Sequence, residues 1–215
     1  MTTGYVELHA KSFYSFGAGA SHAHELLARA KEHGHDALAL TDTNLCGALE
    51  FARLANSLGV RPITGGEITL LDGSRIVLLA KSRQGYGNLS RLFTLANAVD
   101  RRRPRLDPAH LREHAEGLVL LTGGRDGPLA NLLLGGREGE ARELLTDYRL
   151  WFGRDAVYVE LQQNFLQGDT RRNRELARLA DEVGAPVVAT NDVHYHAAER
   201  CRLQHALVAA RLNTT

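Results

Sequence analysis

The sequence predicts an α/β fold in which about seven strands close into a (β/α)7 barrel. Short apolar runs alternate about seven times with longer amphipathic stretches, which is the pattern of repeated βα units. The runs are nearly continuous, as in strands that are buried on both faces of a parallel sheet. No G-x-G-x-x-G motif follows the first run, which favours a closed barrel over a dinucleotide-binding sheet.

The strands are expected at the apolar runs, several of which end in a polar residue. Strand-favouring residues open the chain, and a compact Ala-Leu-Ala-Leu-Thr run follows the first helical stretch. The seven expected strands are residues 5–9, 37–41, 63–71, 75–81, 118–122, 156–162 and 186–190.

The helices are expected where apolar residues recur every three or four positions between capping residues. Ser21 is the expected N-cap of the first helix, and Gly34 ends it. Gly59 ends the second helix, and Asp107-Pro108 begins a short one. The expected helices span about 22–33, 47–58, 86–99, a turn after 108, 127–134, 138–152, 170–183 and 197–212.

The composition is that of a folded globular protein, with 44% hydrophobic and 24% charged residues. It excludes a collagen-like or intrinsically disordered chain. Lys and Arg number 26 against 25 Asp and Glu, which gives a net charge of +1. The near balance excludes a globally basic nucleic-acid binder, so any DNA contact needs a local patch. The one concentrated basic run is residues 101–105.

The cellular context is predicted from cysteines and from apolar segments. Two cysteines cannot form a disulfide framework and indicate a reducing compartment. The chain has no apolar run of 18 residues and no recognisable secretory signal. We therefore expect a cytoplasmic protein without a membrane partner. No Pro-, Gly- or Ser-rich linker interrupts residues 1–215, so we expect a single domain, and its abrupt end fits a fragment of a longer chain.

Polar residues follow several of the expected strands and are candidates for a functional site. The carboxyl ends of parallel barrel strands meet at one mouth, so these residues are expected to converge there. His, Glu and Asp side chains in one pocket are ligands for Zn²⁺ or Mn²⁺. The residues at these strand ends are His9, Lys11, Asp42, Thr43, Glu67, Asp192 and His194.

The other histidines and the basic run have simpler interpretations. We expect a solvent-exposed surface role for His22, His24, His33, His35, His110, His114 and His205. The run at 101–105 is expected to be a solvated turn, with phosphate binding as the alternative. Cys46 and Cys201 are expected to be partly buried thiols.

Several stretches together resemble a known family. They are YVELHAKSFYSFGAGASHAHELLARA, DALALTDTN, GVRPITGGEI, IVLLAKSRQGYGNLSRL, LVLLTGGRDGPLA and VVATNDVHY. This order is similar to the polymerase and histidinol phosphatase (PHP) domain at the N-terminus of bacterial C-family DNA polymerases. The resemblance implies a distorted seven-stranded barrel that binds about three metal ions and hydrolyses phosphoesters. It also implies three partners: the rest of a polymerase chain, DNA through that parent protein, and a replication or repair protein.

The motifs depart from the pattern that the resemblance implies for the metal ligands. Four ligand positions are kept, namely His9, Glu67, Asp192 and His194. Five have lost the ligand and now hold Lys11, Ala18, Thr43, Arg75 and Gly124. Lys11 and Arg75 would bring fixed positive charge to the place of a metal ion. An ammonium or a guanidinium is expected to pair there with Glu67 and Asp192, and which cation pairs with which carboxylate is left open.

The sequence therefore predicts a non-catalytic structural or docking module of a DNA polymerase that acts in replication or error-prone repair. No cofactor is expected; if one is bound, Zn²⁺ or Mn²⁺ fits the kept residues. One alternative is a residual metal-dependent phosphoesterase or 3′-5′ proofreading exonuclease. Another is a phosphate-binding module in which Lys11 and Arg75 hold an anion directly. Polymerisation itself is expected from a domain outside these residues.

Overall fold

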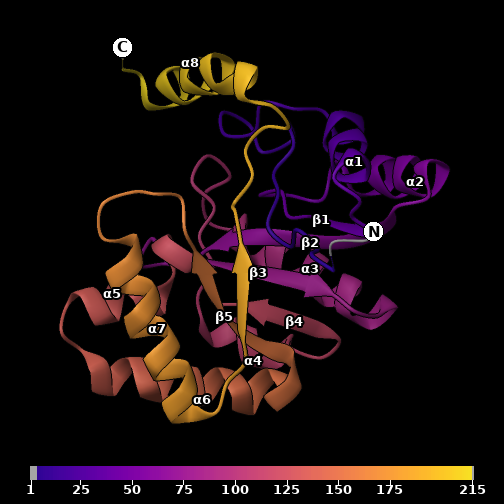
Figure 1. The fold of residues 1–215 in the computed structure, drawn as a ribbon. Coiled ribbons are helices and arrows are strands. Elements are labelled where there is room, and N and C mark those ends of the chain that lie inside the picture. Colours follow the sequence, from indigo (N-terminus) through magenta and orange to yellow (C-terminus); the bar gives the residue numbers. More distant parts are fainter. Residues whose placement is uncertain (1–3, 215) are drawn as a thin grey trace. The chain divides into compact units, whose positions relative to one another are not determined.

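The computed structural model describes residues 4–214 and has the predicted α/β fold (Figure 1). The strands are β1 Ala37–Leu40, β2 Arg61–Thr69, β3 Arg75–Ala80, β4 Leu118–Leu121, β5 Val157–Gln162 and β6 Val187–Thr190. The helices are α1 Ala23–Glu32, α2 Ala48–Leu58, α3 Arg83–Ala96, α4 Ala109–Glu113, α5 Pro128–Leu134, α6 Glu138–Phe152, α7 Asp169–Val183 and α8 Cys201–Leu212. The strand order is β1-β2-β3-β4-β5-β6.

The described residues contain six strands, one fewer than predicted. The missing strand is the one expected at residues 5–9, which is extended but carries only isolated parallel bridges. One bridge joins Glu7 to Leu38 and another joins Ala10 to Val193. The segment therefore lies beside β1 without forming the continuous ladder that defines a strand. None of the helices in the described part of the chain is long and apolar enough to cross a membrane.

The chain forms two compact units, and β2 contributes to both. The first unit contains the described residues up to Gly66 and those from Asp192 onward, and the second contains Glu67–Asn191. In the first unit, β1 pairs with β2 in parallel, from Ala37 opposite Arg61 to Leu40 opposite Thr64. Helices α1 and α2 pack on each other, and α1 also packs on β1.

The core of the first unit follows from the spacing of apolar residues in α1. Ala23, Leu26, Leu27 and Ala30 recur at helical intervals and are all buried. They pack in one cluster with residues of β1 and α2. The N-cap of α1 is His22, so the prediction of Ser21 is wrong.

The second unit combines antiparallel and parallel pairing. β3 and β4 are antiparallel, whereas β4–β5 and β5–β6 are parallel. Helices α5, α6 and α7 pack on one another, and α6 and α7 pack against β5 (Figure 1). The expectation of an entirely parallel sheet is therefore wrong, because an apolar run shows that a strand is buried and not which way it points. β6 also departs from the pattern, since its Val187 is 48% exposed.

Candidate functional site

Two segments of the first unit that are far apart in sequence run side by side. The Val193 N–H donates to the His9 carbonyl at 2.8 Å, and the Lys11 N–H donates to the Val193 carbonyl at 2.8 Å. In extended backbone, residues i and i+2 point to the same face. This pairing therefore brings the side chains of His9 and Lys11 to those of Asp192 and His194.

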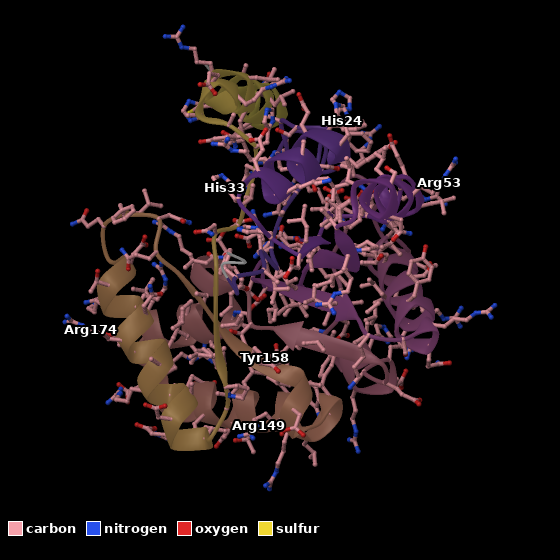
Figure 2. The ribbon with its side chains drawn as sticks, turned by 45° about the vertical axis from the view of Figure 1, so that its right-hand side comes forward. His24, His33, Arg53, Arg149, Tyr158 and Arg174 are labelled. Atoms are coloured by element: carbon pink, nitrogen blue, oxygen red, sulfur yellow. The ribbon has the colours of Figure 1, made fainter. Side chains whose placement is uncertain are left out.

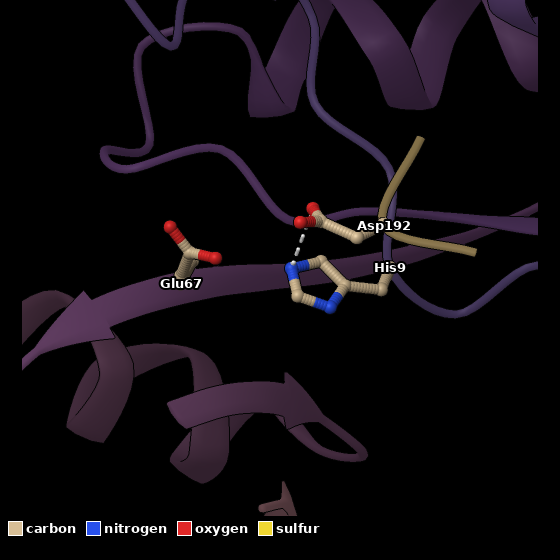
Figure 3. A group of neighbouring side chains, drawn as sticks. All are labelled: His9, Glu67 and Asp192. Carbon is tan, nitrogen blue, oxygen red and sulfur yellow. Dashed lines mark ion pairs between the residues drawn. The ribbon is translucent and has the colours of Figure 1, made fainter. Parts of the chain in front are cut away.

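The Asp192 carboxylate is the centre of this group. Its Oδ1 lies 2.5 Å from the Lys11 Nζ and 3.3 Å from the His9 Nε2, the contact dashed in Figure 3. Its Oδ2 lies 3.3 Å from the His194 Nε2, while the His194 Nδ1 is 3.3 Å from the Ala18 carbonyl oxygen. Lys11 is 1% exposed and His9 is 2% exposed. The site thus holds an ammonium that is almost fully removed from water.

The surrounding charges set the protonation state of Asp192. Burial alone would raise the pKa of this carboxyl, because it disfavours the charged form. Attraction to His9, a hydrogen bond from His194 and attraction to Lys11 act in the opposite direction. Together they hold the pKa of Asp192 well below its usual range. Asp192 is therefore a carboxylate, paired with cationic and hydrogen-bonding neighbours.

Asp42 accepts hydrogen bonds from the segment that follows Lys11, and its role in a functional site stays a prediction. Its Oδ1 accepts hydrogen bonds from the Ser12 N–H at 2.7 Å and the Ser15 hydroxyl at 2.6 Å. Its Oδ2 accepts one from the Ser12 hydroxyl at 2.7 Å. The Thr43 N–H donates to the Ser15 Oγ at 3.2 Å, and the Thr43 side chain is exposed. Asp42 therefore fixes the loop after Lys11 to the end of β1.

The second unit holds another charged pair, formed by Glu67 and Arg75. The buried Glu67, near the end of β2, has its Oε1 3.8 Å from the Arg75 Nη1 at the start of β3. The same Arg75 Nη1 lies 3.5 Å from Asp126 Oδ2. Arg75 is thus shared between two carboxylates of this unit. The assignment of Glu67 as a metal ligand stays a prediction.

A buried polar network in the second unit was missed by the sequence reasoning. The Glu160 Oε1 accepts hydrogen bonds from the Thr190 hydroxyl at 2.5 Å and from the Gln162 Nε2 at 3.1 Å. Its Oε2 accepts one from the Gly123 N–H at 3.0 Å. The available signal was a pair of polar residues, Glu160 and Gln162, two positions apart in an otherwise largely apolar strand.

This network also occupies the space beside Gly124, a position where the resemblance implies a metal ligand. Gly124 has φ +51°, and a Cβ placed there would lie 2.4 Å from the Gln162 Cδ. Any side chain at this position would therefore require Gln162 to move and would strain the backbone.

The remaining histidines and the cysteines divide into two groups. The exposed side chains are His22, His24, His33, His205 and Cys46. The half-buried ones are His35, His110, His114 and Cys201. Figure 2 shows His24 and His33 projecting outward. The predicted exposure is therefore wrong for His35, His110 and His114, which are half-buried, and the predicted partial burial is wrong for Cys46. His35 packs edge-on against Tyr5.

Comparison with known proteins agrees with the motifs. The chain matches the PHP domain family over residues 7–164. It is 38% identical to an error-prone DNA polymerase of Symbiobacterium thermophilum over 98% of this chain and 21% of that protein. It is 37% identical to a DNA polymerase III subunit alpha of Treponema pallidum over 89% of this chain and 18% of that protein. The chain thus spans about a fifth of the length of these relatives.

A solved structure supports the fold. A putative metal-dependent phosphoesterase from Bifidobacterium adolescentis superposes with a TM-score of 0.64 at 12% identity, covering 96% of both chains. The fold, the family match and the motifs agree with one another. The chain therefore belongs to the PHP domain family, in the branch whose relatives are DNA polymerase III alpha subunits and error-prone DNA polymerases.

Proposed function

We propose that this chain is the PHP module of a DNA polymerase III alpha-like polymerase and that its metal centre has been replaced by salt bridges. The module stabilises the parent polymerase or docks a partner, and it does not hydrolyse phosphoesters. The observation that carries this proposal is the buried Lys11 ammonium, 2.5 Å from the Asp192 carboxylate.

Electrostatics supports the replacement. Two unit charges 4 Å apart interact by about 4 kcal/mol at an effective dielectric constant of 20, so a divalent ion at that distance from Lys11 would be repelled by about 8 kcal/mol. The ammonium already neutralises the carboxylate that would bind the ion. A metal would have to displace or deprotonate Lys11 before it could use Asp192.

The donor set also fits a metal cluster poorly. Lys11 offers no lone pair while it is protonated, and Ala18 and Gly124 have no ligand atom. Gln162 crowds the Gly124 position, and Arg75 supplies the cation beside Glu67. Positive protein charge therefore stands beside both carboxylates, and we derive no catalytic step that passes through a metal.

A second candidate function is a residual metal-dependent phosphoesterase or 3′-5′ exonuclease. The observation that favours it is the approach of His9 and His194 to the two oxygens of Asp192. Three protein ligands suffice for one catalytic Zn²⁺. This reading requires Lys11 to leave its carboxylate.

Elemental analysis separates the two functions. After dialysis against micromolar Zn²⁺ and Mn²⁺, we expect less than about 0.1 ion per chain. In the proposed site the Asp192 carboxylate is paired with Lys11, so no complete set of free metal ligands is present. The His9→Ala/Asp192→Ala variant controls for incidental histidine binding. Lys11→His, which replaces the cation with an imidazole, is the positive control and is expected to gain metal.

One ion per wild-type chain, lost in the double variant, would overturn the proposal. Hydrolysis of a 3′-labelled oligonucleotide by the wild-type chain, abolished by the same double substitution, would establish the second candidate instead.

A further inference from the structure

A strongly basic stretch in the second unit is not used by the proposed function. Residues 81–105 carry seven basic side chains and a single acidic one, Asp100, so the stretch has a net charge of +6 while the whole chain has +1. It comprises the two residues before α3, α3 itself and the loop that follows it. The basic residues are Lys81, Arg83, Arg91, Arg101, Arg102, Arg103 and Arg105.

All seven side chains are exposed, and none of them forms an ion pair within residues 4–214. Helix α7 of the same unit is the contrast. It carries four basic and four acidic residues, and three of its arginines pair with carboxylates, namely Arg171, Arg172 and Arg178. Surface arginines in this unit are thus commonly neutralised, but those of the 81–105 stretch are not.

The loop is tied to the end of α3, so the three consecutive arginines have a defined place. The Arg105 N–H donates to the Ala96 carbonyl at 3.0 Å, and the Arg105 guanidinium donates to the Leu70 carbonyl at 3.2 Å. The Arg102 N–H donates to the Asp100 carboxylate at 2.8 Å. Positive charge therefore extends from the N-terminal end of α3 to its C-terminal end. The 14 residues of this helix span about 21 Å.

We propose that this basic α3 surface, formed by the exposed side chains of residues 81–105, binds the phosphate backbone of duplex DNA. A duplex carries one negative charge per about 1.7 Å of axis, so the length of α3 faces about twelve phosphates. Guanidinium groups hold phosphates through paired N–H donors. A basic surface could bind any polyanion. We choose DNA because the proposed function makes this chain part of a DNA polymerase, so this inference rests on the proposed function.

The aromatic content favours a duplex over a single strand. Single-strand binders stack successive bases on several exposed rings. Within 81–105 the aromatic residues are Tyr86, which is 43% exposed, and Phe93, which is half-buried. One exposed ring among seven cations fits backbone contacts without base readout.

The test measures binding of the 215-residue chain to a labelled duplex of about 20 base pairs, two helical turns. If six phosphates are contacted, affinity is expected to fall about 10³-fold between about 50 and 200 mM salt. Replacing Arg101, Arg102 and Arg103 with Gln is expected to reduce the slope of log affinity against log salt by about three units and to weaken binding at low salt at least about tenfold.

The matched control removes the same charge from the balanced helix. Arg171, Arg174 and Arg178 of α7 are replaced with Gln; Figure 2 labels Arg174. We expect its DNA affinity to stay within about twofold of the wild type, because these positions lie outside the basic α3 surface. Urea unfolding of both variants shows that each is folded.

Three outcomes would overturn the inference: equal weakening in both variants, no weakening in the first, or stronger competition by an acidic peptide or a single strand than by the duplex. Binding is expected to be insensitive to chelator. Arginine-dependent DNA binding by a chain that also holds stoichiometric metal would refute the proposed function alone. A metal-free chain without such binding would refute this inference alone.

Discussion

At the scale of a single residue, the proposed replacement of the metal centre rests on Lys11. A buried lysine is costly unless its charge is paired and hydrogen-bonded. Here the ammonium lies on Asp192 Oδ1, and His9 Nε2 approaches the same oxygen. In the proposed function, this ammonium supplies the positive charge that a metal ion supplies in the pattern of the family.

Lys11→Met is expected to destabilise the protein, because it leaves the Asp192 charge without its ammonium. Removing one partner of a buried ion pair costs about 3–5 kcal/mol. Asp192 keeps 22% exposure, so we expect about 3 kcal/mol, at the low end of that range. The measurement is the free energy of unfolding in urea.

The matched variant for this prediction is Lys11→Met/Asp192→Asn, which removes both charges. We expect it to recover part of the lost stability, since no uncompensated carboxylate remains. A single Lys11→Met variant within about 0.5 kcal/mol of the wild type, the usual range for surface changes, would contradict the structural role of the pair.

At the scale of elements, the start of α7 shows how one carboxylate organises a loop. Asp169 Oδ2 accepts hydrogen bonds from the N–H groups of Asn164 at 2.9 Å and Leu166 at 3.0 Å. Its Oδ1 lies 2.6 Å from the Arg172 Nη2. Burial by itself raises the pKa of Asp169, but the Arg172 and backbone hydrogen bonds outweigh it and lower the pKa below the usual value.

A depressed pKa gives Asp169 a defined pH dependence. Its contribution to stability is complete above the unfolded-state pKa of about 3.9 and is lost as the pH falls through the lower folded-state value. Asp169→Asn is expected to cost about 1–3 kcal/mol near neutral pH. Urea unfolding should show this difference shrinking at about pH 3. Asp181→Asn, an exposed change on the same helix, should have little effect at either pH.

The elements could be predicted from sequence where burial decides them. The runs at 37–41, 75–81 and 118–122 became β1, β3 and β4 within one residue at either end, because continuous apolar residues require burial on both faces. Strand direction was not predictable, since β3 and β4 are antiparallel with the same kind of sequence. The segment at 5–9 was predicted as a strand from its strand-favouring residues. It forms only isolated bridges, because composition does not show how many hydrogen-bonded pairs the neighbouring segments can form with it.

Within the site, residue types were predicted better than contacts. The two cations were expected to pair with Glu67 and Asp192 without assigned partners, and in the structure Lys11 pairs with Asp192 and Arg75 with Glu67. The hydrogen bonds from Ser12 and Ser15 to Asp42 were not predicted. Ser21 was expected to cap α1, but its hydroxyl contacts His196 Nδ1 at 2.8 Å. The partners of Asp42 lie 27 to 30 positions away and the partner of Ser21 lies 175 positions away, so local patterns cannot locate them.

At the scale of the whole molecule, the second unit is an insertion within the first. The first unit is made of two chain segments, and the contacts of His9 and Lys11 with Asp192 close a loop over the 125 residues 67–191. If that insertion were unfolded, closing the loop would cost about 4 kcal/mol of chain entropy. β2 also crosses the boundary, with its last three residues in the second unit. The connectivity therefore favours the single domain predicted for residues 1–215.

The only tryptophan, Trp151 on α6, provides a test because it lies in the second unit. Trp151 fluorescence reports the second unit, and far-ultraviolet circular dichroism reports helices of both units. If the chain unfolds as one domain, Lys11→Met in the first unit should lower the urea midpoint of both signals equally. The physical reason is that a folded second unit holds residues 66 and 192 close together, which lowers the entropy cost of closing the first unit. An unchanged Trp151 midpoint beside a biphasic dichroism curve would show two independent domains, and the single-domain prediction would then be wrong.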